Sequence, residues 1–383
     1  MEQFPKKLLT KLSEREDNNA LRSLSKSNRL VDFSSNDYLG LAKNEAVFHH
    51  SMKLLKEHSL VRNGASGSRL LSGNHLLYTE LEKRLCDFHE VESALVLNSG
   101  YDANIGFFGT VPQRGDVVFY DEFIHASIRD GIKMGNAKSF KFKHNDLEDL
   151  KKKCQVERNR GTEEAEFYIV TESVFSMDGD SPDLVAMAKF CKSNNYHLVV
   201  DEAHAIGVYG KNGEGLVQEM GLQDQVFARI ITFGKAIGCH GAAILGSEVL
   251  KGYLINFARS FIYTTGLPPH SIATIIAAYA NLTSFKNTQQ KLQEKILLFN
   301  FNVEQLGLQG RFIKSNSAIH CCIIPGNNKV KSVSQKIWNR GFDVRPILSP
   351  TVPTAKERLR FCIHSYNSTK EIKEVLRLLD SYI

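Results

Sequence analysis

Ile230–Gly238 reads IITFGKAIG, an apolar run that leads into a lysine with one glycine before it and another shortly after it. A lysine in this setting, at the end of a strand, suits imine chemistry. An aldehyde cofactor needs an amine whose pKa is lowered by low dielectric and by nearby cations. The glycines let the backbone approach a bulky ligand, and Thr232 can contact a phosphate. Taken alone, the segment is more often an ordinary loop, so Lys235 needs support from the rest of the chain.

A second segment, LVVDEAH at residues 198–204, places Asp201 at the tip of an apolar strand and His204 one short turn later. A pyridine nitrogen that must stay protonated needs a buried carboxylate such as Asp201. The alternative is the Asp-Glu-Ala-His box of a helicase. That alternative requires a Gly-x-x-x-x-Gly-Lys-Ser/Thr loop upstream. Lys211 and Lys235 each follow a glycine, but neither lies in that pattern, so the helicase interpretation fails.

Two further turns follow predicted strands. NSGYDAN at residues 98–104 runs from a strand into a helix, and a helix N-terminus preceded by small residues binds phosphate. Without Gly-x-Gly-x-x-Gly in this turn, a dinucleotide is not expected. His125 follows the next strand, where an imidazole can stack on a heteroaromatic ring or simply begin a helix. Because each of these segments ends a strand, they are expected to surround one crevice.

Strands alternate with helices from about residue 95 onward, which predicts right-handed βαβ units and an α/β fold with a large, doubly wound, mostly parallel sheet. Helices are expected at 126–134, 147–154 and 184–194. The predicted strands are 95–98, 117–120, 139–143, 167–172, 197–201, 229–233 and 241–245.

Helical periodicity dominates from residue 271 to about 306 and is followed by the pattern of a smaller α+β domain. That domain is expected to hold a strand at 318–324, a helix at 330–340, a strand near 359–363 and a terminal helix from Thr369. The uncharged run 266–285 begins with prolines and is interpreted as a buried helix, not a membrane span. We therefore expect an N-terminal helix and arm at 1–40, with the helix at about 7–24 packed on the small domain or on a partner subunit, a large domain at 41–270 and a small C-terminal domain at 271–383.

The composition is that of a folded globular protein, with 42% hydrophobic and 23% charged residues and a formal net charge of +6. Basic clusters lie beside acidic residues, so nucleic-acid binding is not expected, and the N-terminus lacks the apolar stretch of a secretory signal. No Cys-x-x-Cys pair occurs, which argues against a disulfide framework or a metal site and favours reduced thiols in a cytoplasmic protein. The seven cysteines are Cys86, Cys154, Cys191, Cys239, Cys321, Cys322 and Cys362.

The chain resembles the α-oxoamine synthases, which are pyridoxal-phosphate (PLP) enzymes, from about residue 30 to the C-terminus. The resemblance predicts the PLP-dependent transferase fold type I and an acyltransferase that acts on amino-acid and acyl-CoA substrates as a homodimer with shared active sites. The motifs that carry it are SNDYLG (35–40), GSR (67–69) with SG (72–73), TESVFSMDGD (171–180), the Asp201 box, TFGK (232–235), TTGLPP (264–269) and PTVP (350–353). Residues 124–131 and 144–150 resemble the biotin-pathway branch of the family, whose members condense L-alanine with pimeloyl-CoA to give 8-amino-7-oxononanoate, CoA and CO2.

The resemblance assigns roles to individual residues. Lys235 would carry PLP as a Schiff base and move protons, Asp201 would pair with the ring nitrogen, His204 and Ser176 would lie near the phenolic oxygen, and His125 would stack on the ring. Arg360, with Asn36, would bind the amino-acid substrate. The phosphate would be held by Gly100, Tyr101 and Thr232, with Thr264 or Thr265 from a second subunit.

The chain departs from the family pattern at two positions. Leu348 stands where synthases of this type often have an arginine, and Arg345 is the candidate to replace it as a partner of the acyl substrate. The run NGASGSR at 63–69 is less glycine-rich than usual. These departures concern the acyl substrate and leave open a glycine C-acetyltransferase, a 5-aminolevulinate synthase, a serine palmitoyltransferase or a non-catalytic structural paralogue.

Overall fold

The computed structural model describes residues 4–24, 29–161, 164–282 and 286–383 and divides them into two compact units. The larger unit comprises residues 36–176 and 181–290, and the smaller comprises 1–35, 177–180 and 291–383. The larger unit thus ends at Gln290, beyond the expected residue 270, because helix α11 (Pro269–Leu282) packs against α2 (Glu45–Glu57) and α3 (Leu76–His89). The end of the uncharged run, residues 283–285, lies outside the described residues.

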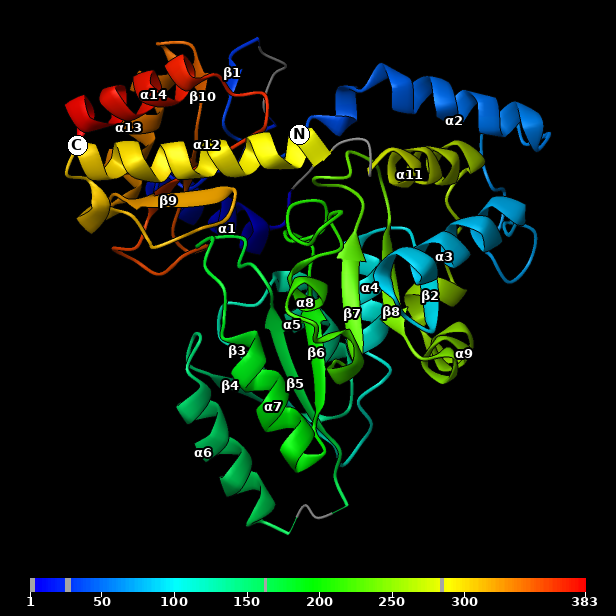
Figure 1. Cartoon of the computed structure of the whole chain (residues 1–383). Coiled ribbons are helices and arrows are strands. Elements are labelled where there is room, and N and C mark those ends of the chain that lie inside the picture. Colours follow the sequence, from blue (N-terminus) through cyan, green and yellow to red (C-terminus); the bar gives the residue numbers. More distant parts are fainter. Residues whose placement is uncertain (1–3, 25–28, 162–163, 283–285) are drawn as a thin grey trace. The chain divides into compact units, whose positions relative to one another are not determined.

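A seven-stranded sheet forms the larger unit, with strand order β2-β8-β7-β6-β5-β3-β4 (Figure 1). Every pairing is parallel except those of β8, which runs against both β7 and β2. The predicted mostly parallel sheet is therefore confirmed, with one reversed strand. The strands are β2 (Ser93–Leu97), β3 (Val117–Asp121), β4 (Lys138–Phe142), β5 (Phe167–Glu172), β6 (His197–Asp201), β7 (Ala228–Thr232) and β8 (Ala242–Gly246).

Helices cover both faces of this sheet (Figure 1), so its central strands are buried apolar runs. The edge strand β4 is different: its sequence KSFKF leaves most side chains exposed, and lysines on an edge discourage pairing with another chain. A core of side chains from α4, α5, α9 and α10 fills one face of the sheet. The remaining helices of the unit are α4 (Gly100–Phe108), α5 (Ala126–Met134), α6 (Leu147–Arg158), α7 (Leu184–Asn194), α8 (Leu216–Glu219), α9 (Glu248–Phe257) and α10 (Arg259–Ile262).

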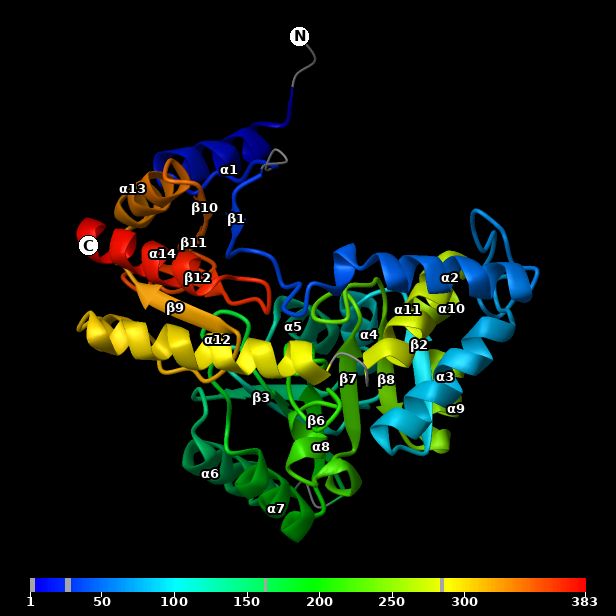
Figure 2. The ribbon, with the colours of Figure 1, turned by 45° about the horizontal axis from the view of Figure 1, so that its top comes forward.

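The smaller unit holds a three-stranded antiparallel sheet, β11-β12-β9, and a two-stranded pair, β1-β10. Figure 2 shows α13 and α14 side by side, and both are amphipathic, with a buried apolar face. The elements are α1 (Lys6–Asp17), β1 (Val31–Asp32), most of α12 (Lys286–Gln305), β9 (Ile319–Ile323), α13 (Asn327–Trp338), β10 (Phe342–Asp343), β11 (Arg345–Ile347), β12 (Arg358–Cys362) and α14 (Thr369–Tyr382).

The N-terminal helix is shorter than the predicted 7–24 and ends at Asp17. Asn19 adopts a left-handed backbone conformation, which stops the helix, and its side chain bonds to Asn328 and Lys331 of α13. These contacts attach the N-terminal segment to the smaller unit. Among the described residues, none of the helices combines the length and the apolar character needed to span a bilayer.

Candidate active site

The carboxyl ends of four parallel strands carry the polar residues of the larger unit. Glu172 ends β5 and lies in register with Asp201 at the end of β6, while His125 follows β3 and Lys235 follows β7. Because parallel strands end at the same edge of a sheet, side chains distant in sequence converge there. This edge is the expected crevice.

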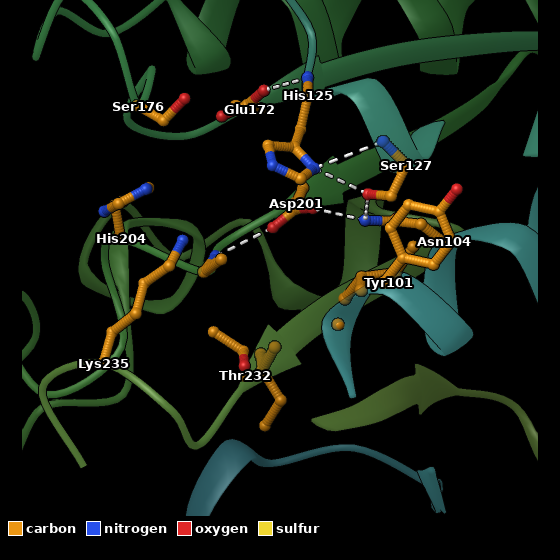
Figure 3. A pocket seen from close by; sticks show the side chains of 14 residues that line it. Tyr101, Asn104, His125, Ser127, Glu172, Ser176, Asp201, His204, Thr232 and Lys235 are labelled. Atoms are coloured by element: carbon orange, nitrogen blue, oxygen red, sulfur yellow. Dashed lines mark hydrogen bonds between the residues drawn. The ribbon is translucent and has the colours of Figure 1, made fainter. Parts of the chain in front are cut away.

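A pocket opens at this edge, and all the residues that line it belong to the larger unit (Figure 3). Eight of the residues singled out from the sequence line it together: Gly100, Tyr101, His125, Ser176, Asp201, His204, Thr232 and Lys235. The other lining residues are Asn104, Ser127, Glu172, Ala203, Ile230 and Ile231.

The carboxylate of Asp201 is held in a fixed orientation at the base of the pocket. Its Oδ1 accepts the Ala203 N–H at 2.9 Å, and its Oδ2 accepts the amide of Asn104 at 2.9 Å. Only 7% of Asp201 is exposed. Each carboxylate oxygen keeps a second lone pair for a ligand.

A buried tyrosine fixes the orientation of the His204 ring through a hydrogen bond to Nδ1. The hydroxyl of Tyr38 lies 2.8 Å from Nδ1 of His204 and donates to Oδ1 of Asn36 at 3.1 Å. Tyr38 is fully buried, so the imidazole rests on a rigid support. Asn36, an expected substrate residue, thus lies in the same hydrogen-bonded group as His204.

The N-terminus of α4 forms another wall of the pocket. Ser99 caps the helix by accepting the Asp102 N–H, and Gly100 and Tyr101 follow as the first helical residues. The first N–H groups of a helix have no partner within it. Thr232 donates to the Gly241 carbonyl at 3.1 Å and lies beside Gly100. This corner therefore combines backbone donors, a hydroxyl and the positive end of a helix, which suits an anion.

Glu172 is a buried carboxyl of the pocket and accepts the backbone N–H of His125. The pKa of Glu172 is raised to about 8, first because the carboxyl is buried and second because the charge of Asp201 is near, and Lys235 offsets only part of this rise. The pKa of His125 lies below its usual value, because the surrounding protein excludes water from the ring and Lys235 and Arg129 repel a second proton. Near pH 7 the pocket therefore holds a neutral imidazole and a largely protonated carboxyl beside the carboxylate of Asp201.

Five predicted residues are not among those that line this pocket: Asn36, described above, and Thr264, Thr265, Arg345 and Arg360. Thr264 and Thr265 accept hydrogen bonds from the Asn98 amide of the same chain. Arg345 and Arg360 belong to the smaller unit. Arg345 forms an ion pair with Asp343 at 2.7 Å, and Arg360 is 8% exposed on β12, with Cys321 opposite it in register.

Four residues of the site were given no role by the sequence reasoning: Tyr38, Asn104, Ser127 and Glu172. All of them lie inside quoted motifs, but their function depends on partners far away in the sequence. Asn104 is the clearest missed signal, because it is a polar side chain in the apolar part of GYDANIGFF and is 2% exposed. A buried amide in such a helix must find a hydrogen-bond partner.

Comparison with known proteins agrees with this geometry. The family model described as aminotransferase class I and II matches residues 28–379. The 8-amino-7-oxononanoate synthase of Emericella nidulans is 38% identical over 370 residues, which cover 92% of this chain and 89% of that protein.

Solved structures are similar over almost the whole chain. Serine palmitoyltransferase from S. paucimobilis, solved with PLP and myriocin bound, has a TM-score of 0.88 at 25% identity and covers 98% of this chain and 96% of its own. The 8-amino-7-oxononanoate synthase from Francisella tularensis has a TM-score of 0.76 at 28% identity, and the match covers 93% of this chain and 98% of that protein. These findings confirm the fold, the PLP cofactor and the acyltransferase class expected from the sequence.

Proposed function

Because the chain belongs to the aminotransferase class I and II family, as a PLP-dependent acyltransferase of the α-oxoamine synthase group, we propose that it condenses L-alanine with a pimeloyl thioester, with pimeloyl-CoA as the first candidate. The products would be 8-amino-7-oxononanoate, CoA and CO2, as part of biotin synthesis. The support for these substrates is the identity to the Emericella nidulans synthase over most of the chain.

The pocket residues fit PLP. Within the described part of the chain, the N–H groups of Gly100 and Tyr101 have no hydrogen-bond partner, so they are available to a phosphate. The Asp201 carboxylate, fixed by Asn104, would face the ring nitrogen, and Lys235 lines the same cavity. When bound, PLP draws electrons from the α carbon of a substrate amino acid, which lets that carbon lose a proton and attack a thioester.

Residues of this chain would move the protons and hold the cofactor ring in position. Lys235 would take the proton from the α carbon and return it after CO2 has left. Asp201 would hold a proton on the ring nitrogen, since its carboxylate is fixed by Ala203 and Asn104. His204, supported by Tyr38, would direct a ring nitrogen at the phenolic oxygen.

Arg360 would bind the carboxylate of the amino acid. A guanidinium grips a carboxylate with two parallel hydrogen bonds, and burial strengthens such a pair. Arg360 is 8% exposed and donates to Cys362 Sγ at 3.0 Å. Discrimination of alanine from glycine by one methyl group is worth about 1–3 kcal/mol, so slow turnover of glycine is expected as well.

Arg345 is the proposed partner of the distal carboxylate of the pimeloyl chain. Its side chain is 40% exposed, and its guanidinium bonds to Asp343 and lies over the Trp338 ring. A second carboxylate must therefore share the guanidinium with Asp343, and its contribution will be modest. We expect Arg345→Ala to lower kcat/KM for pimeloyl-CoA by about threefold to tenfold and to leave heptanoyl-CoA, which lacks the carboxylate, unchanged. Equal losses for both thioesters would remove Arg345 from this role.

The observation that carries the proposal is the convergence of Lys235, Asp201 and His125 on one pocket in a chain that is 38% identical to a named synthase. The test is a CoA-release assay over alanine, glycine and serine, each with pimeloyl-, succinyl-, acetyl- and palmitoyl-CoA, with product identification by mass spectrometry. The highest kcat/KM is expected for alanine with pimeloyl-CoA. A best pair of glycine with acetyl-CoA would refute the proposed substrates.

A second candidate is the condensation of serine with palmitoyl-CoA. It is supported by the TM-score of 0.88 to serine palmitoyltransferase, against 0.76 for the Francisella tularensis synthase. The same assay separates the two, because only this candidate predicts that serine with palmitoyl-CoA is the best pair.

The proposal includes a cytoplasmic homodimer in which residues 264–269 complete the site of the neighbouring subunit. Thr265 and Tyr263 are exposed in the single chain, and Thr264 does not line its own pocket. Sedimentation of the active enzyme is expected to give a dimer. An active monomer would exclude a shared site.

A further inference from the structure

His125 begins helix α5 and caps it with its own ring. As the N-cap residue, it accepts the N–H of Ser127 on Nδ1, at 3.3 Å, and the Ser127 hydroxyl lies 2.7 Å from the same nitrogen. A backbone N–H can only donate, so Nδ1 must carry a lone pair. A hydrogen on Nδ1 would point at the hydrogen of the Ser127 N–H. In the neutral ring the hydrogen therefore belongs on Nε2.

Asn104 fixes the direction of the serine hydroxyl. The amide nitrogen of Asn104 donates to Ser127 Oγ at 3.0 Å and to Asp201 Oδ2 at 2.9 Å. The opposite amide orientation would place an oxygen against the Asp201 carboxylate, so Asp201 determines which way the amide lies. Since Ser127 Oγ accepts from Asn104, its own hydrogen is left for Nδ1 of His125. The hydrogen bonds thus connect Asp201 to His125 with one consistent set of donors (Figure 3).

The other ring nitrogen of His125 faces the pocket. Figure 3 shows it on the side of the ring away from Ser127. Among the described residues, Nε2 has no hydrogen-bond partner, and His125 is an exposed residue that lines the pocket. The positive end of α5, to which the ring is attached, further disfavours a second proton.

We propose that Ser127 and Asn104 are positioning residues that hold His125 as the neutral tautomer with its hydrogen on Nε2, so that the ring presents an N–H donor to a carboxylate or carbonyl oxygen of the substrate. The part that concerns the substrate rests on the proposed function. The part that concerns the tautomer rests on the hydrogen bonds alone. With the opposite tautomer, Nε2 would present a lone pair and repel such an oxygen.

The tautomer is measured directly by long-range 1H–15N NMR of the PLP-bound enzyme labelled with 15N-histidine. His125→Gln assigns the signals by their loss, and the buried His89 and His320, which lie outside the pocket, serve as internal references. The expected spectrum shows a protonated Nε2 and an unprotonated, hydrogen-bonded Nδ1 for His125. A protonated Nδ1, or a ring protonated on both nitrogens at pH 7, would overturn the proposal.

Variants test the two positioning residues. Ser127→Ala and Asn104→Ala are each expected to move the His125 Nδ1 signal toward that of a nitrogen without a strong donor. Ser127→Thr, which keeps the hydroxyl, is expected to restore the signal. The matched control is Ser51→Ala, which removes a buried hydroxyl that bonds to the Phe48 carbonyl in α2. An unchanged Nδ1 signal in Ser127→Ala would contradict the role of the hydroxyl.

Kinetics test the consequence for the substrate. Ser127→Ala is expected to lower kcat/KM for the amino acid by about tenfold while the PLP absorbance stays that of the unaltered enzyme. The NMR experiment needs no substrate, so an error in the proposed substrates would leave the tautomer result intact. A confirmed tautomer with unchanged kcat/KM would refute the N–H donor as a substrate contact.

Discussion

At the carboxyl edge of the large sheet, polar side chains converge on one cavity, whereas Arg345 and Arg358 of the smaller unit form ion pairs with neighbours within that unit. In the pocket, Asp201 is held by donors and still faces a ligand. In the smaller unit, Arg358 pairs with Asp178 at 2.6 Å and Arg345 with Asp343 at 2.7 Å. We therefore propose that the pocket carries the chemistry that the family shares, and that Arg360 and Arg345 bind the substrates. Substitutions in the pocket should accordingly lower kcat, whereas substitutions of Arg360 or Arg345 should weaken substrate binding.

The largest effect is expected from the pocket. Asp201→Asn keeps one acceptor oxygen, enough for only one of the two donors Ala203 N–H and Asn104 amide, and it removes the charge that keeps the ring nitrogen protonated. The enzyme should retain PLP, and kcat should fall by roughly 100- to 1000-fold. Absorbance measures the bound cofactor, and CoA release measures kcat. Turnover near that of the unaltered enzyme would remove Asp201 from its role.

In the smaller unit, Arg360→Lys should act on binding. Lysine keeps the charge and loses the planar pair of donors, so the KM for the amino acid should rise by roughly 10- to 100-fold with PLP binding unaffected. Arg311→Lys, at an exposed position, is the matched control. If Arg360→Lys lowered kcat and left KM unchanged, the division between chemistry and recognition would fail.

The smallest effect concerns stability and comes from Glu172. Its pKa is raised from the ordinary value of 4.5 to about 8, so the folded state binds its proton more tightly than the unfolded chain does. The stabilisation from this proton is complete below pH 4.5 and is lost as the pH rises through 8. Glu172→Gln keeps the acceptor for the His125 N–H and needs no proton.

Thermal denaturation should therefore give Glu172→Gln a Tm about 2–5 °C above the unaltered enzyme at pH 8.5 and no gain at pH 4.5. Glu148→Gln, on the exposed surface of α6, is the control. An equal difference at both pH values would show that Glu172 is not protonated preferentially in the folded state.

Much of the cofactor site could be predicted from the sequence, because the ends of parallel strands meet at one edge whatever the rest of the chain does. Strands 167–172 and 197–201 have the predicted bounds, and His125, Asp201 and Lys235 line one pocket. Local apolar runs with polar ends carry that information.

The rest depended on contacts between distant residues. Asn104 and Ser127 lie in two different helices, and nothing in either segment alone reveals that they bond to each other. The reversed direction of β8 follows from its pairing with β2 and β7. Likewise, α11 belongs to the larger unit because it packs on α2 and α3, although the helical pattern changes before it.

The central claim is that Lys235 carries the cofactor, and borohydride reduction followed by peptide mapping tests it most directly. The purified enzyme should be yellow, and reduction should abolish the visible band and leave the pyridoxyl group on the peptide that contains Lys235. Lys211→Ala, at an exposed lysine that also follows a glycine, should be labelled normally, and Lys235→Ala should not be labelled. A pyridoxyl group on any other lysine of the unaltered enzyme would contradict the account.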